Sequence, residues 1–295
     1  MTSTSVQERQ NKPAALRAAR AFRRRYVLAK RWHVLRLGVG VLLGTAGLVL
    51  ALLDRSTGDY LAAAAAVWIV LSRTVLLRQE THAQDDGALA QEVFDTKVLD
   101  LPWNATTAGP EPAPEDIRNW GEHQSEDEMR DWYADVRPAR HPVDALICQR
   151  ASVTWARQDH APYAQILRVA VVTVVVGTLV LGVALGLSLG EYLLSLGLPV
   201  LPAMLDILDI ANGNEVLGYS RARLAHEADR LYAEARTTGT APSIQDCRSL
   251  QDEIYTTRRI MGVPSWFYRL TRHRRQRNMD EVTQEQVSNL PASLR

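Results

Sequence analysis

Two carboxylates, Asp206 and Asp209, directly follow an apolar stretch that runs from Tyr192 to Leu205. Carboxylates at membrane depth usually face the interior of a helix bundle or a water-filled path, where they pair with cations or lie along an ion route. The simpler interpretation places both residues just outside the membrane, as ordinary residues of a cytosolic helix. The sequence favours this simpler interpretation, and both carboxylates are kept as candidates for the lining of a pore.

The sequence lacks several motifs for nucleotide hydrolysis and metal binding: it has no GxxxxGK[ST] phosphate loop and no HExxH or CxxC spacing. Its seven histidines are scattered and do not pair at ligand spacing. Paired carboxylates such as Asp85 and Asp86 are most simply solvated surface residues. We therefore predict that the protein is not an enzyme and that it uses no metal and no cofactor.

Small residues recur at every fourth position in two apolar stretches, which places them on one helix face. Such faces let helix backbones approach closely and drive helix packing in lipid. The residues are Gly40 and Gly44 in the stretch Leu37–Leu53, and Thr178, Gly182, Gly186 and Gly190 in the stretch Val169–Gly190. The pattern predicts close packing within one bundle or oligomerisation of several chains, and it does not separate the two.

Aromatic and polar residues in the segment between residues 79 and 165 are candidates for a ligand or partner site. They are Trp103, Asn104, Trp132, Tyr133 and Arg150. The structural interpretation places the aromatic side chains in a core, with the amide and the guanidinium satisfying buried backbone groups. The sequence favours the structural interpretation.

The apolar stretches determine the expected fold class. Val169–Gly190 has 22 residues without a charge, and as a helix it would reach roughly 33 Å, against a hydrocarbon core of about 30 Å. Leu37–Leu53 and Tyr60–Leu77 form another pair of spans, with Arg73 near one end, where its long side chain can reach the interface. The fourth span begins with the stretch Tyr192–Leu205, which contains Pro199 and Pro202, and it is the least clearly predicted of the four. We predict four transmembrane helices arranged as two hairpins.

Charge is distributed unevenly along the 295 residues, although the net charge is +1. Residues 1–36 carry ten basic residues and one acidic residue, whereas residues 79–165 carry seven basic and seventeen acidic residues. The positive-inside rule places the basic arm, the acidic loop and the C-terminal tail in the cytoplasm. We therefore predict a multi-pass inner-membrane protein with both termini cytoplasmic, and the charge pattern argues against a nucleic-acid binder.

The predicted fold is an all-α membrane protein with a mainly helical cytosolic domain. Its segments are a basic arm (1–33), a first hairpin (34–78), an acidic helical segment (79–165), a second hairpin (166–210) and C-terminal helices (211–295). Residues 1–13 and 285–295 are expected to be disordered, and Asp95–Asn104 to be extended, because Pro102 disfavours helix at the residue before it. Ser243 and Asp246 are expected to cap a helix. Cys148 and Cys247 are expected to be reduced.

Five short motifs resemble those of one known family. They are EVFDTKVLDLPWN (Glu92–Asn104), EDI (Glu115–Ile117), DWY (Asp131–Tyr133), ICQRASVTW (Ile147–Trp155) and VPSWFYRL (Val263–Leu270). Together with two pairs of spans, they resemble the SMODS-associated four-transmembrane effector family, a family of bacterial proteins proposed to form pores. The resemblance covers most of the chain.

The resemblance implies a cell-suicide effector of antiviral defence, encoded beside a synthase of cyclic oligonucleotides, that damages the inner membrane on activation. It also implies a role for the motif residues of the cytosolic domain. These are Leu101, Pro102, Trp103, Asn104, Asp131, Trp132, Tyr133, Cys148, Gln149, Arg150, Trp266, Phe267 and Tyr268. The implied partners are the lipid bilayer, further copies of the chain and a nucleotide-signal synthase or sensor. The alternative is a membrane-anchored adaptor that recruits a partner without forming a pore.

Overall fold

The computed structural model describes residues 5–53, 58–154, 157–260, 262–263 and 281–295. Throughout these ranges the regular structure is helical and no strand occurs, which confirms the predicted all-α class. The chain forms two compact units. Unit 1 consists of Met1–Val27, Ala83–His160 and Val216–Arg295, and unit 2 consists of Leu28–His82 and Ala161–Glu215.

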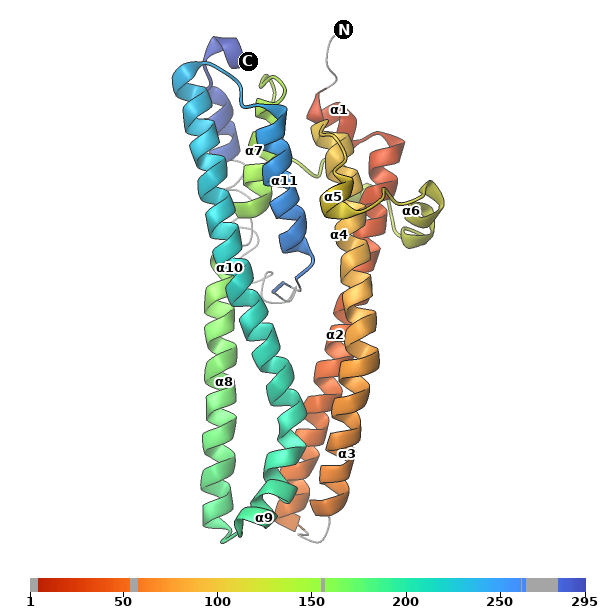
Figure 1. Ribbon diagram of the computed structural model, residues 1–295, viewed down its shortest axis with the longest axis vertical. Coiled ribbons are helices and arrows are strands. Elements are labelled where there is room, and N and C mark those ends of the chain that lie inside the picture. The colour runs from red at the N-terminus through yellow and green to blue at the C-terminus, as the bar shows by residue number, and fades with distance from the viewer. Residues whose placement is uncertain (1–4, 54–57, 155–156, 261, 264–280) are drawn as a thin grey trace. The chain divides into compact units, whose positions relative to one another are not determined.

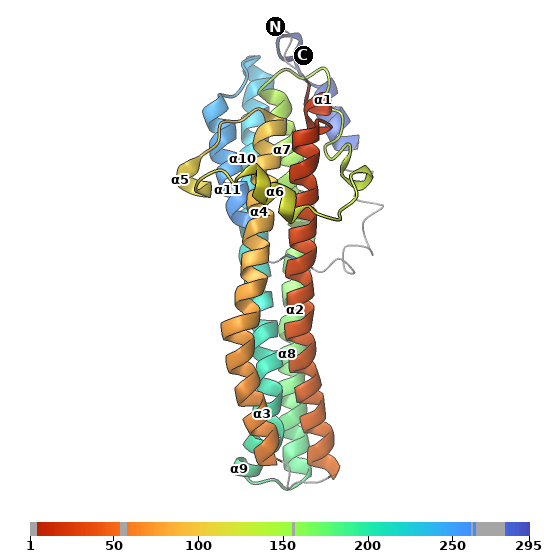
Figure 2. The same ribbon diagram turned by 90° about the vertical axis from the view of Figure 1, so that its right-hand side faces the viewer.

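Unit 2 is built from long helices (Figures 1 and 2). Its elements are the second part of α2 (Pro13–Leu53), α3 (Gly58–Leu71), the π-helix η2 (Ser72–Leu76), the start of α4 (Leu77–Leu99), most of α8 (Arg157–Ala184), α9 (Leu189–Tyr192), the π-helix η4 (Leu193–Gly197) and the start of α10 (Leu198–Thr238).

Three helical runs among the described residues are long and apolar enough to cross a membrane: Tyr60–Leu99, His160–Ala184 and Leu189–Thr238. The apolar windows of the first two are only 17% buried. Their valines and leucines therefore point outward, as in a surface that meets lipid or another membrane helix. The predicted first span, Leu37–Leu53, lies in α2, and its role as a fourth span stays a prediction.

Helix α8 ends at Ala184, before the predicted end at Gly190. Gly186 follows with a φ of +65°, a left-handed conformation that glycine adopts without strain. The N–H of Leu187 bonds to the carbonyl of Gly182 at 3.0 Å, which satisfies one of the last carbonyls of the helix. The prediction that Gly186 and Gly190 continue the helical face of Gly182 is therefore wrong.

The prolines of the fourth predicted span do not interrupt its helix. Leu189–Thr238 is one helical run that contains Pro199 and Pro202. Proline has no N–H, so the carbonyl four residues earlier loses its usual partner. The π-helix η4 lies directly before these prolines and changes the hydrogen-bond pattern at that point, which keeps the run continuous.

Unit 1 packs shorter elements around one apolar core that includes Phe22, Phe94 and Leu146. Its elements are α1 (Val6–Gln10), the first part of α2, the rest of α4, α5 (Ala105–Ala108), α6 (Pro114–Trp120), the 3-10 helix η3 (Asp127–Met129), α7 (Val143–Thr154), the end of α10, α11 (Ile244–Arg258), helical residues 281–288 and the 3-10 helix η5 (Ala292–Leu294). Ser243 and Asp246 form a capping box at the start of α11, which confirms that prediction.

Both ends of unit 1 contribute to its core, so the predicted disorder at 1–13 and 285–295 is wrong for the described residues. Ser5 caps α1, and Val6 is fully buried. Val287, Leu290 and Leu294 are also buried in the same core. A few apolar side chains in a polar segment give little signal in the sequence, but they stabilise the segment once it docks on a core.

The stretch Asp95–Asn104 is also more helical than expected, because α4 continues to Leu99. Val98 and Leu99 are fully buried, so the core side of the helix extends through them. The non-helical conformation begins only at Asp100, which has a φ of 54°. The non-helical stretch was therefore predicted to begin about one helical turn too early in the chain. Pro102 restricts only the residue directly before it, so it does not prevent helix at Asp95 to Leu99.

Candidate functional site

A network of buried charges lies inside unit 2. The guanidinium of Arg36 in α2 donates through Nη1 to Oδ1 of Asp206 in α10. Nη2 of Arg73 in η2 lies 3.3 Å from the same Oδ1. Nε of Arg36 donates to Oε2 of Glu80 in α4 at 3.0 Å, and Nδ1 of His33 lies 2.9 Å from Oε1 of Glu80. We call these five residues the unit 2 network.

Four residues of the unit 2 network are almost closed to solvent, whereas the side chain of Arg73 is 30% exposed. The side chains of Arg36 and Asp206 are 4% and 2% exposed, and Oδ2 of Asp206 is buried without a hydrogen-bond partner. Asp209 pairs with Arg73 at the edge of the network, where its side chain is 54% exposed. Asp206 is therefore buried and paired, while its position inside or just outside the membrane stays a prediction. Arg73 binds these carboxylates rather than only reaching toward an interface.

The predicted glycine face of α2 lies against α10 inside unit 2. A Cβ at Gly40 would lie 3.4 Å from the backbone of α10, and a Cβ at Gly44 would lie 3.3 Å from Cα of Val200. Gly47, which the sequence pattern did not include, is tighter still, because a Cβ there would lie 2.5 Å from Cβ of Pro199. These distances require small residues at the contact.

Thr178 and Gly182 form a notch on α8 that holds the ring of Tyr192. Oγ1 of Thr178 lies 3.3 Å from the hydroxyl of Tyr192, and a Cβ at Gly182 would lie 2.9 Å from the ring. A Cβ at Gly186 or Gly190 would meet no atom within 4 Å. The predicted stripe is thus divided, and a role for these residues in oligomerisation or pore lining stays a prediction.

A second buried network lies in unit 1, around α11. Arg248 donates to Oε1 of Glu92 at 2.6 Å, and Gln251 donates to both Glu92 and Asp95, at 2.8 and 2.9 Å. Nη1 of Arg258 lies 2.5 Å from Oδ2 of Asp95. All five side chains are buried. We call them the unit 1 network.

Three of the family motifs identified from the sequence meet at the unit 1 network. Glu92 and Asp95 belong to the first motif, and the hydroxyl of Tyr133 from the DWY motif donates to Asp95 at 2.8 Å. Gln149 from the CQR motif donates to Cys247 O and to Gln251. Burial and the nearby Asp95 carboxylate raise the pKa of Tyr133 well above its usual value, which keeps the donor protonated. Arg258 contacts the same ICQRASVTW motif as Gln149, since its Nη2 donates to Ser152 Oγ.

The loop motif contributes through its amide and carbonyl groups. Asn104 caps α5 by accepting from the N–H of Thr106 at 3.0 Å, and it donates to Asp252 of α11 at 2.7 Å. The carbonyl of Pro102 accepts from Arg248 at 3.0 Å. Leu101 is buried in the core. The favoured structural interpretation of Asn104 therefore holds only in part, because its partners are a cap and a side chain of α11.

The remaining motif residues have different environments. Trp103 is half-buried and donates to the carbonyl of Gly109 at 2.9 Å. Trp132 is 41% exposed, although its ring packs edge-on against Phe22. Arg150 pairs with Asp229 at the edge of unit 1. Trp266, Phe267 and Tyr268 lie outside the described residues.

Both cysteines are free and buried in unit 1. Burial raises the pKa of the Cys247 thiol to about 12, and it raises the pKa of Cys148 well above its usual value. A thiol kept protonated is a poor nucleophile. Both cysteines belong to the apolar core of unit 1.

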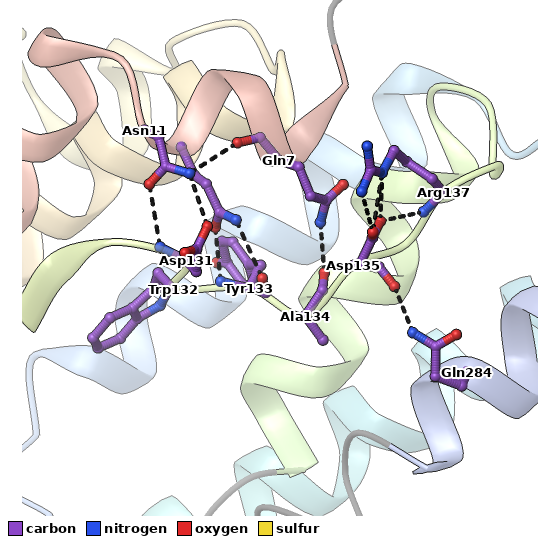
Figure 3. A pocket seen from close by; sticks show the side chains of 10 residues that line it. Gln7, Asn11, Asp131, Trp132, Tyr133, Ala134, Asp135, Arg137 and Gln284 are labelled. Atoms are coloured by element: carbon purple, nitrogen blue, oxygen red, sulfur yellow. Dashed lines mark hydrogen bonds and ion pairs between the residues drawn. The ribbon is translucent and has the colours of Figure 1, made fainter.

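A polar pocket of about 510 Å³ lies in unit 1 between α1 and the DWY motif (Figure 3). Gln10 accepts from the N–H of Tyr133 at 2.8 Å and donates to its carbonyl at 3.2 Å. Gln7 donates to Ala134 O, and Asn11 donates to the carboxylate of Asp131. These amides hold the backbone of the motif against α1, so the pocket is built mainly by a structural contact.

One sequence segment that matches a hydrolase motif has a different conformation in the structure. The segment Gly186–Gly190 reads GLSLG and matches the GxSxG pattern, which in hydrolases places the serine on a strand-to-helix turn. Here Ser188 is instead the N-cap of α9, and its Oγ donates to Glu191 at 2.8 Å. No group of three His, Cys, Asp or Glu side chains is placed to hold a metal ion in the described ranges. The networks are suited to holding helices together.

The sequence interpretation missed most members of both networks. The sequence patterns did not single out Arg36, His33 and Glu80 in unit 2, or Arg248 and Arg258 in unit 1. One signal was available for unit 2: Arg73 and Asp206 both lie within or beside apolar stretches, and such charges normally pair with each other. No comparable signal marks Arg248, because charged residues are common on exposed helix faces.

Comparison with known proteins supports the resemblance that the motifs indicated. The family model described as the SMODS-associating 4TM effector domain matches residues 4–286. A probable CBASS effector molecule of Bacillus cereus (strain VD146) is 24% identical over 286 residues, which covers 93% of this chain and 96% of that protein. No solved structure matches the chain. Because the family model covers nearly the whole sequence, this chain belongs to the SMODS-associating 4TM effector family.

Proposed function

We propose that this protein is a membrane effector of bacterial antiviral defence, which opens a path through the inner membrane when a nucleotide signal activates its system. The family match and the name of the Bacillus cereus relative support a CBASS effector. The three apolar helical runs support a place in the membrane.

The observation that carries the pore is the unit 2 network. Ionisable side chains in apolar helices are unfavourable in lipid, and they normally face a bundle interior or a water-filled path. The charged groups of Arg36, Arg73 and Asp206 come from three helical segments and meet inside unit 2. A passive membrane anchor needs no interior charges, so this arrangement favours a permeation path over a tether.

The proposed topology has four spans as two hairpins, with Leu37–Leu53 of α2 as the additional span. The basic residues before this span place the N-terminus in the cytoplasm by the positive-inside rule, and an even number of spans then places the C-terminus there as well. The outward-facing apolar side chains of α8, among them Val172, Val176 and Val180, support contact with lipid or with further copies of the chain.

Membrane depolarisation in cells tests the proposed function. The parent protein is expressed together with its neighbouring defence genes, and the potential is followed with a voltage-sensitive dye after the system is triggered. Gly44→Leu should depolarise the membrane even before the system is triggered, because a Cβ at Gly44 lies 3.3 Å from Cα of Val200 and a leucine there would force α2 away from α10. Gly38→Leu is the matched control on the same helix, since a Cβ there meets no atom within 4 Å.

The parent and the Gly38→Leu variant are expected to depolarise the membrane, at equal levels of inserted protein. Growth arrest by the triggered parent without depolarisation would contradict the pore and favour the membrane-anchored adaptor. A Gly44→Leu response that still requires the trigger would show that the contact between α2 and α10 does not control the path.

A further inference from the structure

The unit 2 network joins three continuous helical runs that are far apart in the sequence: α2, η2 together with α4, and α10. Arg36 in α2 is its central residue, because it bonds to Glu80 of α4 through Nε and to Asp206 of α10 through Nη1. Arg73, in η2, reaches Asp206 from the other side at 3.3 Å. Loss of the bond to Asp206 therefore removes a polar connection between α2 and α10.

The centre of the network, formed by Arg36, Glu80 and Asp206, is buried and incompletely satisfied. The guanidiniums of Arg36 and Arg73 face the carboxylates of Glu80, Asp206 and Asp209, while Oδ2 of Asp206 has no hydrogen-bond partner. A buried ion pair adds little net stability, because both charges lose their hydration, but removal of one partner leaves an uncompensated buried charge. Such a network specifies one arrangement of its helices, and any other arrangement must admit water.

Arg73 lies on a π-helical element. The π-helix η2 spans Ser72–Leu76, and Oγ1 of its Thr74 donates to the carbonyl of Val70 in α3 at 2.7 Å. A π-helical turn contains one more residue than an α-helical turn and often occurs at functional positions. Conversion of η2 to α-helix would shift the register by one residue, which turns a side chain by about 100°. That rotation would take Arg73 away from Asp206.

We propose that the unit 2 network is a latch that holds the helices of unit 2 in a closed arrangement. The latch is closed while Arg36 binds both Glu80 and Asp206, and it opens when activation separates α10 from α2. In the open arrangement the freed charges of Arg36, Arg73 and Asp206 become hydrated between the helices. The effect on membrane permeability rests on the proposed function, whereas the latch itself concerns helix packing.

A reporter thiol at the contact between α2 and α10 measures whether the latch is open. Val200 is 6% exposed and packs against Gly44, and cysteine is smaller than valine, so Val200→Cys keeps the closed packing. The full-length protein is placed in vesicles of phosphatidylethanolamine and phosphatidylglycerol, and the rate of labelling by a maleimide is measured. The buried native thiols, Cys148 and Cys247, report in the same experiment whether unit 1 stays folded.

The test variant is Asp206→Asn, and the matched control is Glu215→Gln on the same helix. Glu215 pairs with Arg168, but both of these side chains are about 40% exposed, at 39% and 42%. Asp206→Asn is expected to raise the labelling rate of the reporter by about tenfold or more, because it leaves a buried guanidinium without its partner. Glu215→Gln should leave the rate unchanged, since exposed pairs contribute little.

An unchanged labelling rate in Asp206→Asn would overturn the latch. If the native thiols also become reactive in that variant, Glu80→Gln, which breaks the other bond of Arg36, takes its place. Unfolding of both variants would overturn the proposal too, because the network would then be a general requirement for folding.

Release of a trapped dye from the same vesicles separates the latch from the proposed function. Faster labelling together with dye release supports both. Faster labelling without dye release, in a protein that also fails to depolarise cells, contradicts the pore and leaves the latch in place.

Discussion

The guanidinium of Arg248 lies 2.6 Å from the carboxylate of Glu92, although these residues are 156 positions apart in the sequence. Their side chains are only 4% and 1% exposed. The pair connects α11 with α4, and Gln251 of α11 bonds to the second oxygen of the same carboxylate at 2.8 Å. The docking of α11 in unit 1 therefore depends on a buried polar contact as well as on apolar packing.

Replacement of Arg248 by methionine should strongly destabilise unit 1. The change leaves the buried carboxylate of Glu92 without its cation, which typically lowers the free energy of unfolding by about 3–5 kcal/mol. Arg223→Gln is the control, because Arg223 pairs with Glu253 where the side chains are 68% and 46% exposed, and such pairs contribute about 0–1 kcal/mol. Denaturant unfolding in detergent, followed by tryptophan fluorescence, measures both. Equal losses would show that burial of the pair is unimportant.

Arg150→Ala should change stability only slightly. Arg150 pairs with Asp229, whose side chain is 47% exposed, so the expected loss in unfolding free energy is at most about 1 kcal/mol. Thermal melting measures this loss, and growth arrest in cells measures activity. Loss of toxicity with unchanged melting would indicate a partner site at Arg150, whereas a large drop in melting temperature would contradict the expected edge position.

Gly47→Ala should destabilise unit 2 more than Gly38→Ala. A Cβ at Gly47 would lie 2.5 Å from Cβ of Pro199, so the helices must move apart, at a cost of about 1–3 kcal/mol. At Gly38 nothing lies within 4 Å, and alanine is there the better helix former. Thermal unfolding of the two variants in detergent tests the difference. Similar melting temperatures would mean that α2 and α10 are not in contact at this point.

Gly186→Ala should also be destabilising, but for a reason of backbone conformation. Gly186 has a φ of +65°, and an alanine in that conformation costs about 1–2 kcal/mol. Gly190→Ala is the control, because Gly190 lies in α9 and a Cβ there meets no atom. Melting temperatures in detergent distinguish them. Equal effects would favour the original interpretation, in which both glycines serve one packing face.

The two thiols should be unreactive at pH 8 in the folded protein and reactive after denaturation. The pKa of Cys247 is raised to about 12 from an ordinary value of 9.0, so the folded thiol stays protonated while the unfolded thiol titrates. Below pH 9 both states are protonated and stability is unaffected. As the pH rises from about 9 to about 12, proton loss favours the unfolded state and stability falls. Iodoacetamide labelling and unfolding at pH 8 and pH 10 measure this. Cys247→Ala should reduce the alkaline loss, and an unchanged loss would assign it to other groups.

The all-α class, the apolar stretches and the family could be predicted because each depends on local or short-range information. Helical periodicity and the length of an apolar run are visible within a few turns, and the capping pair Ser243 and Asp246 is only three residues apart. Family motifs can be recognised one at a time, without their mutual placement.

The tertiary structure determined which residues work together. Arg36 and Asp206 are separated by 170 positions, and nothing local distinguishes this pair from other charges beside apolar runs. The end of α8 at Ala184 depends on the left-handed conformation of Gly186, which a regular glycine spacing conceals. By itself the sequence determined that apolar helices form and that this family is the right one. Only packing decided which charges those helices enclose, because the partners of a buried charge are set by contacts between distant segments and not by spacing along the chain.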